Sequence, residues 1–156
     1  MDKQRLQQQV IQLLENDLAA AIRAAQTAHE AATHEENIAE NKYDTLGLEA
    51  SYLAAGQARR VEEIRQALQA WRTVQLRAFD EQAGIQLGAL VELSSDNGKR
   101  QCLLLGPDGA GLKVQGDGGE IMLITPRAPL GQQLLGQGIG DEVGSGALRW
   151  TIDQVY

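Results

Sequence analysis

In the first half of the chain, apolar residues recur every three or four positions, which is the spacing of one face of an α-helix. From residue 3 to residue 37 this stripe begins with Leu, Val and Ile and becomes almost entirely Ala between residues 19 and 32. It predicts a helix about 50 Å long, at a rise of roughly 1.5 Å per residue. Because alanine lets two helices approach closely but buries little apolar area, the outer part of this helix should be slender and less stable than its base.

A second helical stripe follows after a short break. Its apolar residues have spacings of three, four and three: Val61, Ile64, Leu68 and Trp71. Residues 52–54 before them, and Val74 and Ala78 after them, continue the same seam, as is typical of a coiled coil. Two helical stretches of similar length with a short connection predict an antiparallel hairpin.

The connection between the two predicted helices is rich in acid. Five carboxylates lie in or beside it: Glu35, Glu36, Glu40, Asp44 and Glu49. One interpretation is a solvated helical turn, in which Asp44 or Thr45 caps the second helix. The other is an acidic tip that supplies oxygen ligands to a magnesium ion held mainly by another protein, since magnesium accepts one or two carboxylates and keeps several waters. The residues by themselves favour the first interpretation and leave the second open.

After residue 84 the pattern changes to short apolar runs separated by glycine-containing turns. Strands are predicted over residues 85–93, 100–105, 112–114, 120–125 and 147–156. Asn97-Gly98 is the strongest hairpin signal among the turns. Residues 129–135 predict one short helix, with Pro129 in its first turn and Gly136 at its C-terminal end. The expected architecture is a small antiparallel sheet packed on one short helix, an α+β domain.

Composition places the boundary between these two parts. All three prolines lie after residue 100, and only two of the 17 glycines precede residue 84. We therefore predict a helical hairpin domain over residues 1–80, with its acidic tip near residues 35–49, and a second domain over residues 81–156. The net charge of −7 divides into −3 for the first domain and −4 for the second. Neither domain is basic, which argues against direct binding to nucleic acid and for action through a protein partner.

No self-contained active site is visible in the sequence, and we expect the chain not to be an enzyme. There are one cysteine and two histidines, His29 and His34, so no Cys/His set has metal-ligand spacing. The glycine runs at residues 109–111 and 136–140 lack the lysine and the flanking elements of a phosphate loop. Cys102 lies in an apolar run and is predicted to be a buried strand thiol. No apolar stretch approaches the ~20 residues that span a bilayer, and a soluble cytoplasmic protein is expected.

The run from Ile124 to Val143 carries the most specific pattern in the chain. It resembles the signature of the Gre family of bacterial transcription elongation factors, in which a short Ser-Pro-Leu-Gly helix leads to Leu-Leu-Gly and then Gly-Asp. Ala128 stands where that family usually has serine. The residues that match are Pro129, Leu130, Gly131, Leu134, Leu135, Gly136, Gly140 and Asp141.

The resemblance implies several properties of this chain. The second domain would be FKBP-like and would dock, through the matching residues, at the rim of the RNA polymerase secondary channel. The hairpin would enter that channel. We expect the protein to be a monomer and to bind neither a membrane nor a specific nucleic-acid sequence. Prolyl isomerase activity is not implied, because the second domain lacks the aromatic residues such a pocket needs.

The tip differs from the pattern of the cleavage-stimulating family members, which is Asp-Leu-x-Glu-Asn-Ala-Glu-Tyr. In one register Glu40 and Asn41 match, but Asn37 stands where the leading Asp should be. In the other register Glu49 matches the later part, with Asp44 five residues ahead instead of three. The resemblance thus implies a polymerase-binding elongation regulator that shares any magnesium ion with the polymerase. It leaves open stimulation of transcript cleavage and non-catalytic inhibition. A coiled-coil adaptor is the alternative, since an Ala-rich seam can also pair between chains.

Overall fold

The computed structural model describes residues 2–38 and 46–156, and for residues 35–38 and 46–50 it describes the helical backbone alone. Contacts divide the chain into two units. The hairpin unit is Gln12–Gln69, and the β unit combines Met1–Ile11 with Ala70–Tyr156. The predicted boundary at residues 80 and 81 therefore lies within the β unit. The reason is that side chains from the first three helical turns bond to the backbone of this unit.

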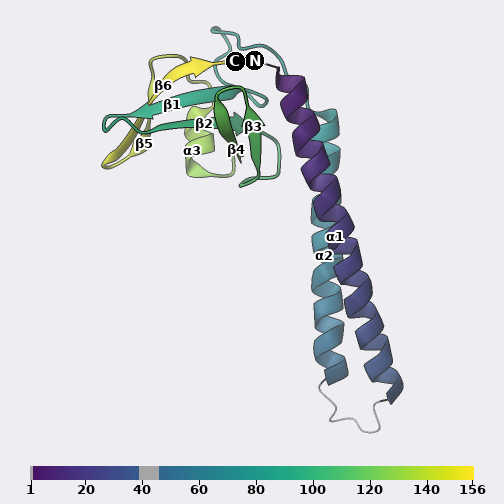
Figure 1. The fold of residues 1–156 in the computed structure, drawn as a ribbon. Helices are drawn as coiled ribbons and strands as arrows, with labels where there is room; N and C mark the ends of the chain where they lie inside the picture. Colours follow the sequence, from purple (N-terminus) through teal and green to yellow (C-terminus); the bar gives the residue numbers. More distant parts are fainter. Residues whose placement is uncertain (1, 39–45) are drawn as a thin grey trace. The chain divides into compact units, whose positions relative to one another are not determined.

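The hairpin unit is formed by parts of two long helices, α1 (Lys3–Ile38) and α2 (Leu46–Thr73), which lie side by side and antiparallel (Figure 1). The buried residues of its seam are Leu14, Ala21, Ala32, Val61, Ile64, Ala67 and Leu68. The change from leucine to alanine along α1 follows the predicted stripe, which confirms the helical hairpin. No helix in the described part of the chain is both long and apolar enough to cross a membrane.

Helix α2 ends at Thr73, so Val74 and Ala78 lie beyond it, although the stripe predicted that they continue it. The Val74 amide still bonds to the Ala70 carbonyl, at 3.0 Å. The Trp71 carbonyl instead accepts a bond from the Gln7 side chain, at 2.7 Å. A side chain from α1 thus satisfies one of the carbonyl groups that a helix leaves free at its C-terminal end.

The β unit contains a six-stranded sheet and one short helix (Figure 1). The strands are β1 (Leu90–Ser95), β2 (Arg100–Leu105), β3 (Lys113–Gly116), β4 (Gly119–Ile124), β5 (Glu142–Ser145) and β6 (Leu148–Val155). Their order in the sheet is β3-β4-β2-β1-β6-β5, and the helix α3 (Pro129–Leu134) lies between β4 and β5 in the chain. This arrangement confirms the predicted α+β class.

Two features of the sheet were not predicted. Strands β2 and β4 pair in parallel, with Leu103 opposite Met122, because β3 occupies the connection between them and folds back on β4. Strand β5 was missed, since its four residues include one glycine and one serine and show no long apolar run. The remaining neighbours in the sheet pair antiparallel, as predicted.

The core of the β unit joins the sheet to α3 and to the segment before β1. Its buried members are Ile85, Ala89, Val91, Leu93, Leu103, Leu105, Leu134, Val143, Ile152 and Val155. Phe79, Ile124, Leu130 and Trp150 are partly buried against it. Because Leu134 belongs to this cluster, the Gre-like run is held by the same core as the sheet and the segment that contains Ile85.

Cys102 is half-buried on β2, opposite Glu92 of β1, whereas the sequence predicted a buried strand thiol. Burial of the Cys102 thiol, together with the smaller effect of the Glu92 carboxylate, raises its pKa from 9.0 to about 11. The thiolate is the reactive form, so alkylation at about pH 8 should be about a hundredfold slower in the folded protein than in the urea-unfolded chain. Iodoacetamide labelling followed by mass spectrometry measures this ratio.

The same shift of the Cys102 pKa has a consequence for stability. The folded chain holds the thiol proton more tightly than the unfolded chain, so the contribution of this group is complete below the unfolded-state pKa. It should be lost as the pH rises from about 9 to about 11, and the Cys102→Ser variant should lack this part of the alkaline decline. Equal alkylation rates in the folded and unfolded chains would contradict the assignment.

Candidate functional site

The Gre-like run builds α3 and the turn that follows it. Ala128 is the N-cap residue, with extended backbone (φ −78°, ψ 146°), and its side chain makes no capping bond. Pro129 occupies the first turn, where the missing N–H costs nothing. Serine, which the family usually has at this position, would supply the capping oxygen that alanine lacks. Helix α3 therefore depends on packing more than on its cap.

Gly131 and Leu134 fix α3 against the β unit. A methyl group at Gly131 would overlap the carbonyl oxygen of Thr125, so the helix approaches the end of β4 more closely than any larger residue allows. Thr125 is itself buried, and its carbonyl accepts a bond from the Ala128 amide at 3.1 Å. Leu134 is fully buried in the core. These two matching residues thus hold the helix in place from the inside.

The turn after α3 is tied to two parts of the β unit. Gly136 has a φ of +80°, which the end of a helix often requires, and its amide bonds to the Ile85 carbonyl at 2.8 Å. The Asp141 carboxylate accepts a bond from the Gly138 amide at 2.8 Å. The Gly140 amide bonds to the Ile152 carbonyl of β6 at 2.7 Å. The turn is therefore a defined surface and not a free loop.

The eight residues predicted for docking divide by burial. Gly131 and Leu134 are buried and Leu130 is half-buried, so these residues support the helix. The five exposed members are Pro129, Leu135, Gly136, Gly140 and Asp141. Only these five can meet a partner without rearrangement of the core. The sequence pattern could not separate the two groups, because both are apolar or glycine residues at similar spacing.

A cavity of about 760 Å³ lies beside this surface. Leu135 and Gly136 line it, together with residues of the segment after α2 and of the segment before β1, including Phe79 and Leu87. Leu87 and Leu135 are both exposed, and the charged residues of the lining are Arg77 and Asp80. A cavity of this size and character can accept apolar side chains of a partner.

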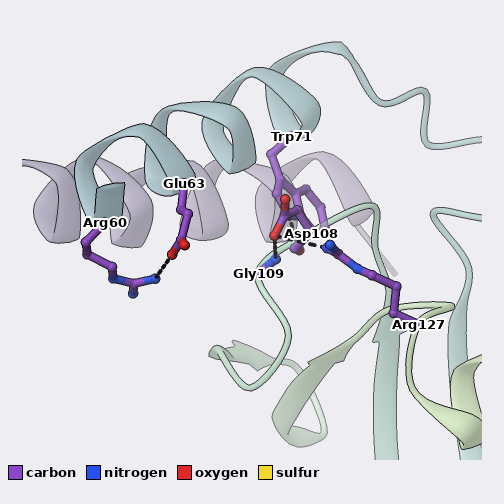
Figure 2. Close-up of polar contacts among 6 residues, drawn as sticks. All are labelled: Arg60, Glu63, Trp71, Asp108, Gly109 and Arg127. Atoms are coloured by element: carbon purple, nitrogen blue, oxygen red, sulfur yellow. Dashed lines mark hydrogen bonds and ion pairs between the residues drawn. The ribbon is translucent and has the colours of Figure 1, made fainter. Parts of the chain in front are cut away.

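A second cluster anchors the end of α2 within the β unit (Figure 2). The Trp71 indole N–H donates to the Asp108 carbonyl at 2.7 Å, and the Asp108 carboxylate accepts from the Gly109 amide at 2.8 Å. Arg127 forms an ion pair with the same carboxylate at 3.4 Å. The sequence predicted Trp71 as a seam residue of the coiled coil alone. The sequence did predict the turn Gly106-Pro107-Asp108-Gly109. It could not show that the Trp71 indole packs against this turn, because the two are far apart in the chain.

The acids predicted for the hairpin tip are outside what the structure describes. Glu40 and Asp44 lie outside the described residues, and Glu35, Glu36 and Glu49 lie where the backbone alone is described. Farther along the hairpin unit, Arg60 and Glu63 form an exposed ion pair at 3.8 Å (Figure 2). Among the described residues, no group of three or more His, Cys, Asp or Glu side chains could hold a metal ion.

The fold and the Gre-like run define a two-part α+β protein, with a candidate docking surface on the β unit and a predicted acidic tip on the hairpin.

No family model and no curated protein matches the sequence. Solved structures that resemble the chain include the GreA factor homolog 1 (Gfh1) protein of Thermus thermophilus, with 24% identity, 94% of each chain covered and a TM-score of 0.37. A second structure, of the transcription factor Gfh1, has 21% identity and a TM-score of 0.39, over 94% of this chain and 92% of that one. Gfh1 of Thermus aquaticus has 25% identity and a TM-score of 0.38, over 93% and 92%.

Proposed function

We propose that this chain is a transcription elongation regulator that binds bacterial RNA polymerase at its secondary channel. The observation that carries the proposal is the placement of the Gre-like run. Its exposed members lie on α3 and the turn after it, and Leu135 and Gly136 also line an apolar cavity. The same chain carries a narrow hairpin whose predicted tip holds five carboxylates. A docking surface and an acidic hairpin tip are the two parts that such a regulator requires.

Docking would occur through apolar contact. The β unit, proposed to be FKBP-like, would place Leu135 against the channel rim and receive an apolar side chain of the polymerase in the adjoining cavity. Leu135 is 40% exposed, so it can lose further surface on binding. Burial of apolar area also suits a chain with a net charge of −7, which is not attracted to the nucleic acid by its own charge.

The tip would act on chemistry that belongs to the polymerase. Two of the carboxylates, among Glu40, Asp44 and Glu49, would reach toward the polymerase magnesium. The chain itself would have no catalytic activity. If cleavage occurs, the tip would help to hold a second magnesium ion and orient a water molecule for attack on the RNA backbone. If it does not, the same insertion would obstruct the channel and inhibit the polymerase.

A backtracked bacterial elongation complex at fixed magnesium concentration tests the proposal. Shortened transcripts that can still be extended would identify a cleavage factor. No cleavage, combined with competition against a Gre factor for the complex, would identify a channel-binding inhibitor. If the protein causes no cleavage and does not compete with the Gre factor, polymerase binding through this surface is ruled out.

The tip acids give a prediction within the same assay. If the chain stimulates cleavage, Asp44→Asn and Glu49→Gln together should reduce the cleavage rate by about a hundredfold or more, because the second magnesium ion loses charged ligands. Binding should not change, since the docking surface lies in the β unit. Glu30→Gln, farther along α1, is the matched control and should retain cleavage. Full cleavage by the double variant would discard this assignment of the tip.

The docking surface gives a second functional prediction. Leu135→Asp should weaken polymerase binding by at least about tenfold, because a carboxylate would have to be desolvated in an apolar contact. Leu148→Asp is the matched control, since Leu148 is 58% exposed and lies on β6, outside the Gre-like run. Circular dichroism should show both variants folded, and fluorescence anisotropy with labelled protein gives the two dissociation constants. Equal affinities of the two variants would refute docking through Leu135.

The alternative is a coiled-coil adaptor that never meets the polymerase. Tyr52 and Leu53 on α2 were predicted to continue the seam, but they are 70% and 63% exposed, which favours a protein contact by the hairpin. Large exposed side chains of this kind can contribute to a small interface. Light scattering over a concentration series separates the two functions, because the adaptor should self-associate whereas the polymerase regulator should remain a monomer.

A further inference from the structure

Three dipeptides in the chain place an asparagine or aspartate directly before a glycine, namely Asn97-Gly98, Asp108-Gly109 and Asp117-Gly118. In such a dipeptide the backbone nitrogen of the glycine can attack the carbonyl carbon of the preceding side chain. Glycine permits this approach because it has no Cβ to obstruct it. The three dipeptides look alike in the sequence, but the structure gives their side chains different surroundings.

The two aspartate dipeptides are poor candidates for this reaction. The Asp108 carboxylate accepts a bond from the Gly109 amide at 2.8 Å and forms an ion pair with Arg127 at 3.4 Å. Both contacts are made by a negatively charged carboxylate, and this charge repels a nucleophile. The same charge protects Asp117. Asn97 has a neutral side-chain amide, which is the better electrophile.

Asn97 lies in the turn between β1 and β2, where residues 96–99 are all exposed. The Ser95 hydroxyl donates to the side-chain carbonyl oxygen of Asn97. The same hydroxyl oxygen accepts a bond from the Lys99 amide at 3.2 Å, which makes the hydroxyl a stronger donor. Ser95 therefore polarises the carbonyl group whose carbon would be attacked.

We propose that Asn97 is a site of self-modification, at which the Gly98 nitrogen converts the side-chain amide into a carboxylate. A base from solvent takes the Gly98 amide proton, and the nitrogen forms a bond to Cγ of Asn97. Negative charge gathers on Oδ1, where the Ser95 hydroxyl stabilises it. The Cγ–Nδ2 bond then breaks, and the leaving nitrogen takes a proton from water and departs as ammonia. Water opens the resulting cyclic imide at either carbonyl, which gives aspartate or β-linked isoaspartate.

The turn permits both the attack and its product. The Gly98 amide donates to the Ser95 carbonyl at 3.0 Å, and this bond must break before the nitrogen can turn toward Asn97. It is one bond in an exposed turn, so it slows the attack by about tenfold at most. An atom added at Gly98 in the position of a Cβ would meet nothing within 4 Å. The extra main-chain carbon of isoaspartate therefore has room beyond the last pair of the β1–β2 ladder, Ser94 with Arg100.

Peptide mapping by mass spectrometry tests the proposal on the folded full-length chain, kept in mildly alkaline buffer and sampled over time. Asn97 should change to a mixture of aspartate and isoaspartate, while Asp108 and Asp117 keep their normal linkage. Gly98→Ala should react about tenfold more slowly or less, because its Cβ obstructs the nitrogen. A folded chain in which Asn97 stays an amide, while the urea-unfolded chain is converted, would overturn the proposal.

The hydroxyl of Ser95 is tested in the same experiment. Ser95→Ala should slow the conversion in the folded chain by about threefold or more, whereas Ser95→Thr retains a hydroxyl and should react at the parent rate. Ser94→Ala is the matched control, since the Ser94 hydroxyl donates to Asp153 and should not affect the reaction. All of these chains should react equally in urea, where the turn is lost. A folded Ser95→Ala protein that reacts as fast as the parent would refute the part assigned to Ser95. These results are independent of polymerase binding.

Discussion

Replacing Trp71 with alanine should destabilise the β unit by about 3–5 kcal/mol. The Trp71 side chain is 0% exposed, and its ring packs directly on Gly106, where no side chain could be added without overlap. Alanine would leave a cavity and would also remove the donor to the Asp108 carbonyl. Loss of this anchor should release the 106–109 turn together with the end of α2.

Urea denaturation followed by circular dichroism measures the effect, with two variants for comparison. Trp71→Phe keeps most of the ring but leaves the Asp108 carbonyl without its indole partner, and should cost about 1–3 kcal/mol. Gln66→Ala, at an exposed position of α2, should change the free energy of unfolding by less than about 0.5 kcal/mol. An alanine variant as stable as the parent would show that the indole is not the anchor.

Gly131→Ala should destabilise the β unit by about 1–3 kcal/mol, although alanine is the better helix former. The added methyl group would overlap the Thr125 carbonyl, which is part of the backbone and cannot rotate away. Helix α3 would have to move, and the exposed Leu135 would move with it. Polymerase affinity should therefore fall together with stability if the proposed docking is correct.

Gly138→Ala is the matched control for this prediction. Its added methyl group would find its nearest neighbour, a carboxylate oxygen of Asp141, at an ordinary distance of 3.9 Å. Thermal denaturation should place the Gly138→Ala transition close to that of the parent and the Gly131→Ala transition clearly below it. Equal transitions would mean that α3 tolerates displacement and that Gly131 has no special packing role.

The sequence predicted those parts of the fold in which the local pattern and the tertiary contacts agree. Leu14, Val61 and Ile64 follow a helical period, and the structure buries them in the seam of the hairpin. The predicted strand over residues 100–105 coincides with β2. The hydrophobic pattern did not predict a short strand whose formation depends on the strand it pairs with. Strand β5 forms against β6, with Val143 opposite Trp150, although its own residues have little strand character.

The candidate site was predicted in the same uneven way. The run from Pro129 to Asp141 was recognised as a short helix and a turn, which the structure confirms through the bounds of α3 and the positive φ of Gly136. Which members are buried could not be predicted, because Leu134 and Leu135 are neighbours of the same type with opposite exposure. The roles of Gln9 and Lys3 were also missed, since their partners are main-chain atoms far away in the sequence.

The sequence by itself determined the division into a helical and a strand-rich part, the α+β class and the place of the Gre-like run. These features depend on periodicity, on glycine and proline content and on the spacing of a few residues, all of which are local. Only the tertiary structure decided that Trp71 anchors a turn in the β unit, that Gln9 and Gln133 close the two edges of the sheet, and that Leu135 faces solvent beside a cavity. The physical reason is that these contacts join residues many positions apart. Every residue has a backbone carbonyl, so the type of the accepting residue does not show that it accepts such a hydrogen bond.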